Sequence, residues 1–155
     1  MTGEYVWDPG EANPKQKLFF ASRKLYTAYG GAKGGGKTWA VRTKALLGAY
    51  NYAGIRILME ALVDALEHPG VHSYLFRRTY PELQSNHIEP MLKMINPEFC
   101  SYNGSLRSIY FANGSLIHFG HWAGETSELE YNGQEYDWIF LDEATQFTWR
   151  SFQFL

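Results

Sequence analysis

The stretch that decides the fold is residues 31–38, which read Gly31-Ala32-Lys33-Gly34-Gly35-Gly36-Lys37-Thr38. This stretch satisfies the pattern G-x-x-x-x-G-K-[ST]. Its glycines let successive backbone N–H groups turn toward phosphate oxygens, in places where a Cβ atom would intrude. In such a loop Lys37 reaches the β- and γ-phosphates and the Thr38 hydroxyl ligates Mg²⁺. The motif therefore predicts a site for nucleotide phosphates and a magnesium ion.

The motif requires a strand before it and a helix after it. Lys24–Tyr29 alternates in character and contains aromatic residues, which predicts a strand that leads into the loop. From Lys37 to about Tyr52 no proline interrupts the chain, and small and apolar positions predict a helix. The positive end of that helix would face the phosphates. A short helix is also expected from about Gln16 to Arg23.

A second candidate motif lies 105 residues after Lys37, where Trp138–Leu141 predicts a short buried strand followed by Asp142 and Glu143. Ligands of open α/β sheets bind at the carboxyl ends of the strands. Asp142 would hold the hydrated magnesium ion, and Glu143 would polarise the water that attacks the γ-phosphate. An acidic pair after a strand can also be a solvated turn. Its combination with the phosphate loop favours the functional interpretation.

The rest of the chain predicts further strands and helices. Ile55–Glu67 is expected to be helical, and Val71–Phe76 is an apolar run suited to a buried strand. Leu83–Ile95 predicts a helix with a kink or break at Pro90. Phe99–Trp122 carries two Asn-Gly pairs between alternating runs, which predicts three short antiparallel strands.

Composition indicates one globular domain over residues 1–155, with 45% hydrophobic and 19% charged residues. A formal net charge of −2 argues against binding nucleic acid through a large basic face. The single cysteine excludes an internal disulfide and suggests a reducing compartment. The polar N-terminus predicts no secretory signal, and no apolar stretch reaches the about 18 residues of a membrane span.

With their flanks, the two motifs resemble the ATPase domain of the large terminase subunit, the motor that packages DNA in tailed bacteriophages. The likeness covers nearly the whole chain. It includes GGAKGGGKT with a basic residue inside the loop, the segment Phe76–Leu83, and Asn132–Asp137 running into LDEATQFT, which is the most specific part. Pro14–Gln16 with the following Leu18–Phe20 looks like the segment on the adenine side. We therefore expect an α/β fold, a P-loop NTPase three-layer sandwich with a mostly parallel sheet and an antiparallel hairpin insertion.

The resemblance also implies roles. Gln16 would recognise adenine, Lys33 would help to sense the γ-phosphate, and Lys37, Lys33 and Glu143 would serve catalysis. ATP would be the substrate and Mg²⁺ the cofactor, bound through Thr38 and Asp142. The nucleotide-binding set would be Gln16, Gly31, Ala32, Lys33, Gly34, Gly35, Gly36, Lys37 and Thr38. The implied partners are double-stranded DNA in the assembled motor, the portal protein, the small terminase subunit and further copies of the chain, at the procapsid in the host cytoplasm.

The sequence departs from the family pattern in two ways. It stops at Leu155, before the coupling motif and the nuclease domain, so the domain is expected to be C-terminally incomplete and its ATP hydrolysis weak or absent. No Lys or Arg lies between Ser108 and Trp149, which leaves Arg107 or an upstream arginine as the arginine finger. Arg77 and Arg78 read either as a solvated strand end or as contacts to phosphate or a neighbouring subunit. A helicase-like P-loop ATPase and a truncated nucleotide-binding module without turnover remain alternatives.

Overall fold

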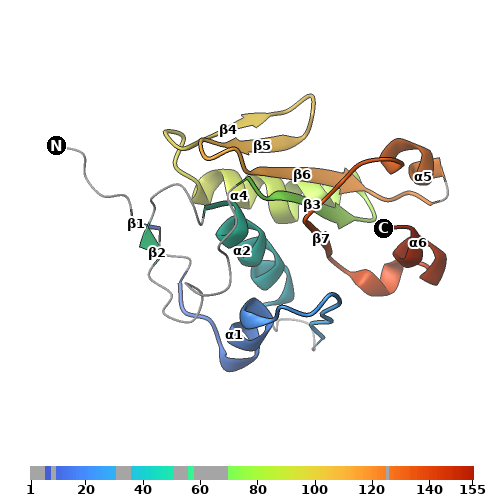
Figure 1. Cartoon of the computed structure of the whole chain (residues 1–155), viewed down its shortest axis with the longest axis horizontal. Helices are drawn as coiled ribbons and strands as arrows, with labels where there is room; N and C mark the ends of the chain where they lie inside the picture. The colour runs from blue at the N-terminus through green and yellow to red at the C-terminus, as the bar shows by residue number, and fades with distance from the viewer. Residues whose placement is uncertain (1–5, 8–9, 31–35, 51–55, 58–69, 125) are drawn as a thin grey trace.

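The fold is given by a computed structural model of the chain (Figure 1). The structure describes residues 6–7, 10–30, 36–50, 56–57, 70–124 and 126–155. The first five residues of the glycine-rich motif, 31–35, therefore lie outside the described residues. So does most of the helix expected over Ile55–Glu67, whose described part, Arg56–Ile57, forms a short strand.

Five strands form one mixed sheet in the order β4-β5-β6-β3-β7. β3 pairs in parallel with both β6 and β7, whereas β5 pairs antiparallel with β4 and β6. A separate parallel pair joins β1 to β2. The bounds are β1 (Val6–Trp7), β2 (Arg56–Ile57), β3 (His72–Arg77), β4 (Cys100–Asn103), β5 (Ser108–Phe111), β6 (Leu116–His121) and β7 (Trp138–Leu141).

The α/β class is confirmed, and the expected sheet is confirmed in part. The described sheet is mixed and only partly parallel, since the pairs of β3 are parallel and those of β5 are antiparallel. The three predicted antiparallel strands are present and belong to this sheet. β6, the third of them, lies in the middle of the sheet beside β3 because Ile117, Phe119 and Gly120 are buried and suit a strand covered on both faces. The antiparallel strands thus extend the same sheet that carries β7.

Helices occupy the positions predicted near residues 16–23, 37–52 and 83–95, and residues 126–131, 144–146 and 149–154 form helical segments that were not predicted. The helical elements are α1 (Pro14–Ala21), α2 (Lys37–Tyr50), α3 (Tyr80–Leu83), the π-helical turn η2 (Gln84–Ile88), α4 (Glu89–Met94), α5 (Thr126–Tyr131), the 3₁₀ turn η3 (Ala144–Gln146) and α6 (Trp149–Phe154). α3, η2 and α4 form one continuous helix, so Pro90 does not break it; a π turn stands directly before the proline instead. Within the described part of the chain, no helix has the length and apolarity needed to cross a membrane.

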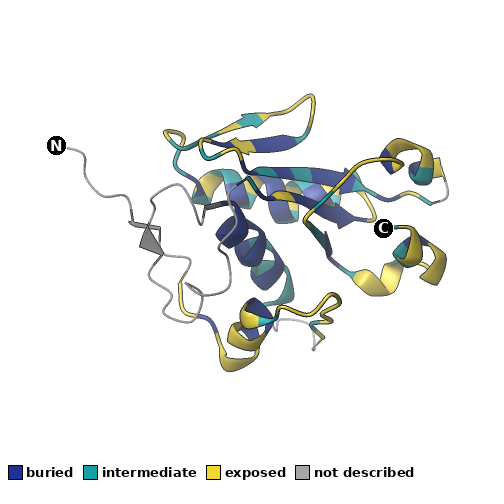
Figure 2. Cartoon of the chain, viewed as in Figure 1, coloured by how far each residue is buried: buried dark blue, intermediate teal, exposed yellow. Residues whose placement is uncertain are grey.

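The strand expected over Lys24–Tyr29 is absent, and that prediction was wrong. These residues are described, and they form no ladder with any described strand. Leu25 and Tyr26 remain 88% and 72% exposed, so these two apolar side chains lie outside the core (Figure 2). Alternation favours a strand only where a partner edge is available, since an isolated strand leaves its backbone groups unpaired.

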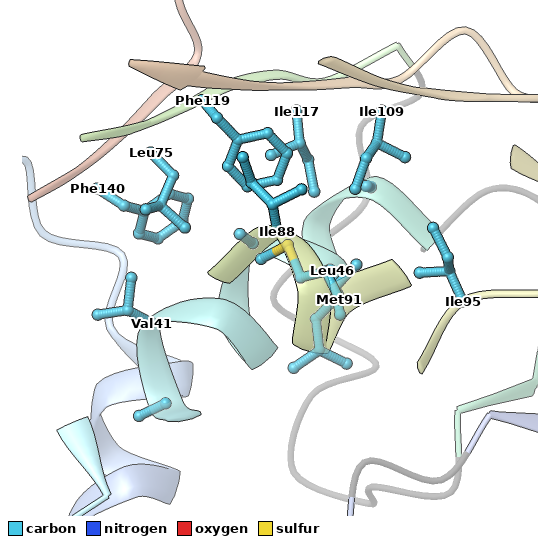
Figure 3. Packing of buried hydrophobic residues seen from close by; sticks show 14 of the residues in the cluster. Val41, Leu46, Leu75, Ile88, Met91, Ile95, Ile109, Ile117, Phe119 and Phe140 are labelled. Carbon is cyan, nitrogen blue, oxygen red and sulfur yellow. The ribbon is translucent and has the colours of Figure 1, made fainter. Parts of the chain in front are cut away.

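Apolar side chains cover both faces of the sheet. Along β3, Leu75 points to one face while Tyr74 and Phe76 point to the other, as strand geometry requires. On the Leu75 face, strands meet α2 and the 80–94 helix in the cluster seen in Figure 3, which contains Val41, Leu46, Leu75, Ile88, Met91, Ile95, Ile109, Ile117, Phe119 and Phe140. A smaller aromatic cluster on the other face contains Tyr74, Phe76, Trp122 and Tyr131.

α1 is held at both ends. At its start Asn13 accepts from the Gln16 amide at 3.0 Å while the Gln16 side chain accepts from the Asn13 amide at 2.8 Å, a reciprocal capping box. At its end Lys44 of α2 donates Nζ to Phe19 O at 2.7 Å and to Ser22 O at 3.2 Å. Burial lowers the pKa of Lys44 to about 8. Lys44 therefore joins α1 to α2. Because its side chain is buried, keeping it charged costs free energy, and this cost depends on pH.

We expect the free energy of unfolding to rise as the pH increases from about 8 to about 9.5. The folded chain releases the Lys44 proton at about pH 8, whereas an unfolded lysine keeps it until about pH 10.4. The unfolded state thus binds more protons in this window, and the slope can reach about 1.4 kcal/mol per pH unit. Urea unfolding across the window should show the slope in the wild type and lose it in Lys44→Met. The exposed Lys17→Met serves as control, and equal slopes in wild type and Lys44→Met would contradict the assignment.

Candidate functional site

Two charged residues meet at the carboxyl ends of neighbouring parallel strands. Phe76 of β3 is in register with Leu141 of β7, so the next residues, Arg77 and Asp142, adjoin each other. Strand alternation places both on the Leu75 face, which α2 and the 80–94 helix cover (Figure 1). Both are buried, at 8% and 3% exposure. The predicted position of Asp142 at a strand end is confirmed, but it lies inside the protein rather than on a solvated turn.

Three groups converge on one oxygen of Asp142, His87 and Thr38 by hydrogen bonds and Arg77 by its charge. Oδ2 lies 2.9 Å from His87 Nε2, 3.1 Å from Arg77 Nη1 and 3.2 Å from the Thr38 hydroxyl, which donates to it. The other oxygen, Oδ1, lies 3.5 Å from the Thr38 hydroxyl. A carboxylate can accept about four hydrogen bonds. The arrangement thus saturates one side of Asp142 and leaves the other side with acceptor capacity.

The protonation states follow from burial and charge. Burial lowers the pKa of His87, Asp142 works against this, and the positive charges of Arg77 and Arg42 add to the lowering. Burial would raise the pKa of Asp142, but the His87 hydrogen bond, the Arg77 charge and the Thr38 hydroxyl outweigh it and hold the pKa below its ordinary value. An ionised Asp142 can only accept hydrogen bonds, so the neutral His87 ring carries its proton on Nε2.

Arg77 links three carboxylates. Besides Asp142, its Nη2 lies 4.0 Å from Glu143 Oε1 and its Nε lies 3.7 Å from Glu82 Oε2. Glu143 has a left-handed backbone with φ of 56°, a strained conformation for a residue with a side chain. Its side chain is 38% exposed, so it is partly open to solvent beside the buried Asp142. Arg78 points elsewhere and donates to Gln146 O at 3.1 Å.

The N-terminus of α2 carries the last residues of the glycine-rich motif. Gly36 has φ of 69°, which favours glycine, and a Cβ there would stand 2.6 Å from Gln16 Nε2. Gln16 is buried, and its Nε2 donates to Gly36 O at 3.3 Å. Lys37 and Thr38 form the first turn of α2, and the chain turn at Gly36 directs Thr38 to Asp142. Gly31, Ala32, Lys33, Gly34 and Gly35 lie outside the described residues.

The oxygen atoms of the site fit a magnesium ion. Mg²⁺ prefers oxygen ligands and usually keeps waters and phosphate oxygens around one or two protein groups. The Thr38 hydroxyl and the Oδ1 side of Asp142 supply such groups at one place. No group of three or more His, Cys, Asp or Glu side chains that could hold a metal ion occurs in the described ranges. An ion here would thus depend on phosphate and water for its remaining ligands.

The sequence interpretation missed His87 and left Arg77 undecided. His87 is fully buried and contacts Asp142, 55 residues away. No motif marks it, and in the sequence it ends the polar run Gln84-Ser85-Asn86-His87, which gives no reason to expect burial. Arg107, the downstream alternative for an arginine finger, stacks its guanidinium 4.0 Å from the centre of the Tyr80 ring and contacts His121. Of these arginines, Arg77 is the one that contacts the acidic pair.

Comparison with known proteins identifies no relative of this chain. No family model, curated protein or solved structure matches the chain. The functional interpretation therefore depends on the motifs in the sequence and on the geometry around Asp142.

Proposed function

We propose that this chain binds ATP with Mg²⁺ and is the ATPase domain of a DNA-packaging motor of the phage terminase type. The observation that carries the nucleotide site is the 3.2 Å contact between the Thr38 hydroxyl and Asp142 Oδ2, across 104 residues of sequence. Thr38 ends a glycine-rich motif and lies in the first turn of α2, and Asp142 directly follows strand β7. These are the two groups that P-loop ATPases use to hold magnesium.

In the proposed site each residue has a defined task. Backbone N–H groups at the N-terminus of α2 would bind phosphate oxygens, and Lys37 would neutralise the β- and γ-phosphates. Asp142 is ionised and would accept from metal-bound water on its Oδ1 side. Glu143, partly open to solvent beside it, would orient the attacking water. The magnesium ion, once bound with the nucleotide, would neutralise charge on the phosphates.

Sequence alone supports the packaging role. The segment Asn132–Asp137 leading into LDEATQFT and the loop GGAKGGGKT together are typical of terminases. Under this proposal DNA, the portal protein, the small subunit and further copies of the chain are partners. The P-loop three-layer sandwich is part of the same proposal. Hydrolysis by this chain alone is expected to be slow if a neighbouring subunit, and not an upstream arginine of the same chain, supplies the arginine finger, because such a finger is typically worth about 10³–10⁵ in rate.

The proposed site is tested by removing the charge of Asp142. We expect Mg²⁺ to strengthen ATP binding in the wild type and Asp142→Asn to lose most of that gain, because a neutral amide attracts a hydrated cation far less than a carboxylate does. Calorimetry with ATP, with Mg²⁺ or with EDTA, measures both quantities. Asp137→Asn, at the other end of β7, is the matched control. A full magnesium gain in Asp142→Asn, or no ATP binding by the wild type, would refute the proposal.

A further inference from the structure

His87 lies where the 80–94 helix widens into a π turn. The Glu89 amide donates to Gln84 O, five residues back instead of four. Such turns are rare and occur frequently at functional sites. The wider turn lets two consecutive residues, His87 and Ile88, face inward, and both are 0% exposed. Ile88 packs in the apolar cluster while His87 reaches Asp142.

The π turn has an identifiable cause. Pro90 has no backbone N–H, so the carbonyl of Asn86, four residues earlier, cannot receive the helical hydrogen bond from position 90. Arg42 of α2 donates Nη1 to Asn86 O at 2.9 Å instead. Arg42 follows Thr38 by four residues and shares its side of α2. One face of α2 thus contacts both Asp142, through Thr38, and the backbone beside His87, through Arg42.

We propose that His87 is a positioning residue that fixes the rotation of the Asp142 carboxylate. Its Nε2–H, with Arg77 and Thr38, holds Oδ2, so that Oδ1 stays turned toward the place where a hydrated Mg²⁺ would bind. The inference rests on the proposed nucleotide site and adds a residue to it. Hydrogen-bond partners of metal-binding carboxylates typically change metal affinity by about 10–100-fold when they are removed.

The first experiment compares His87→Met, which keeps bulk but has no donor, with His87→Gln, whose amide can donate from a similar position. ATP affinity is measured by calorimetry in Mg²⁺ and in EDTA. We expect His87→Met to reduce the magnesium-dependent gain by about 10–100-fold. Its affinity in EDTA should stay near that of the wild type, and His87→Gln should recover most of the gain. The exposed His72→Gln is the control.

Two outcomes overturn the inference: a wild-type magnesium gain in His87→Met, or an equal loss in both variants, which would indicate packing rather than the hydrogen bond. If His87→Met does not fold, His87→Gln provides the test. A folded His87→Gln that lacks the magnesium-dependent gain in ATP affinity overturns the inference, and a folded His87→Gln that keeps this gain supports it. Absence of ATP binding by the wild type would instead refute the proposed function.

The second experiment needs neither nucleotide nor metal. Proton–nitrogen NMR of the free chain should show the His87 ring in the Nε2–H form, with a downfield, slowly exchanging proton. Asp142→Ala should shift or abolish that signal, because the proton loses its acceptor. A ring in the Nδ1–H form, or a signal unchanged in Asp142→Ala, would overturn the inference even if ATP binding behaves as proposed.

Discussion

Replacing Arg77 with methionine is expected to lower the free energy of unfolding by about 3–5 kcal/mol. Arg77 and Asp142 are both buried and lie 3.1 Å apart, so removing the guanidinium leaves an uncompensated carboxylate in the protein interior. Methionine fills most of the space of the arginine stem, which limits the loss of packing. Urea unfolding at neutral pH, monitored by circular dichroism, measures the change.

A double substitution separates charge from packing. In Asp142→Asn the carboxylate is neutral, so adding Arg77→Met should cost much less than it does in the wild type. The exposed Arg78→Met, next in sequence, should change stability by less than about 0.5 kcal/mol. If Arg77→Met proves equally costly with and without the Asp142 charge, the guanidinium is not the counter-ion that holds Asp142 ionised.

Replacing Lys37 with alanine is expected to weaken ATP binding by about 10–150-fold, the equivalent of a charged hydrogen bond worth about 1.5–3 kcal/mol. Lys37 is the first residue of α2 and the motif lysine that meets the β- and γ-phosphates in P-loop proteins. The fold should persist, since alanine favours a helix. Calorimetry with ATP in Mg²⁺ measures the loss, and circular dichroism checks the fold.

Lys93→Ala is the matched control for Lys37→Ala, because Lys93 is an exposed lysine on α4 and its loss changes the net charge equally. We expect ATP affinity in this control to stay within about twofold of the wild type, as for a distant, screened charge. Unchanged affinity in Lys37→Ala, with wild-type binding intact, would show that the glycine-rich motif is not the phosphate site.

The sequence by itself determined the features that depend on local pattern. Helix α2 after the motif, the buried strand β3, the position of strand β7 and the Asn-Gly turns of the antiparallel strands were all predicted, because periodicity and turn chemistry act over a few residues. β7 is less buried than expected, since of its four residues only Phe140 is buried. The placement of Asp142 at a strand end followed from four apolar residues before it. The pairing of Thr38 with Asp142 was expected from motif knowledge, and its contact distance came from the tertiary structure.

Only the tertiary structure decided which strands find partners and which side chains surround Asp142. Lys24–Tyr29 has a strand-like pattern, yet it pairs with no described strand, since ladder formation depends on an available edge and not on alternation alone. His87 reaches the site because Pro90 and Arg42 favour a π turn that rotates it inward. A contact across 55 residues depends on how a helix packs against a sheet, and no short-range pattern encodes it.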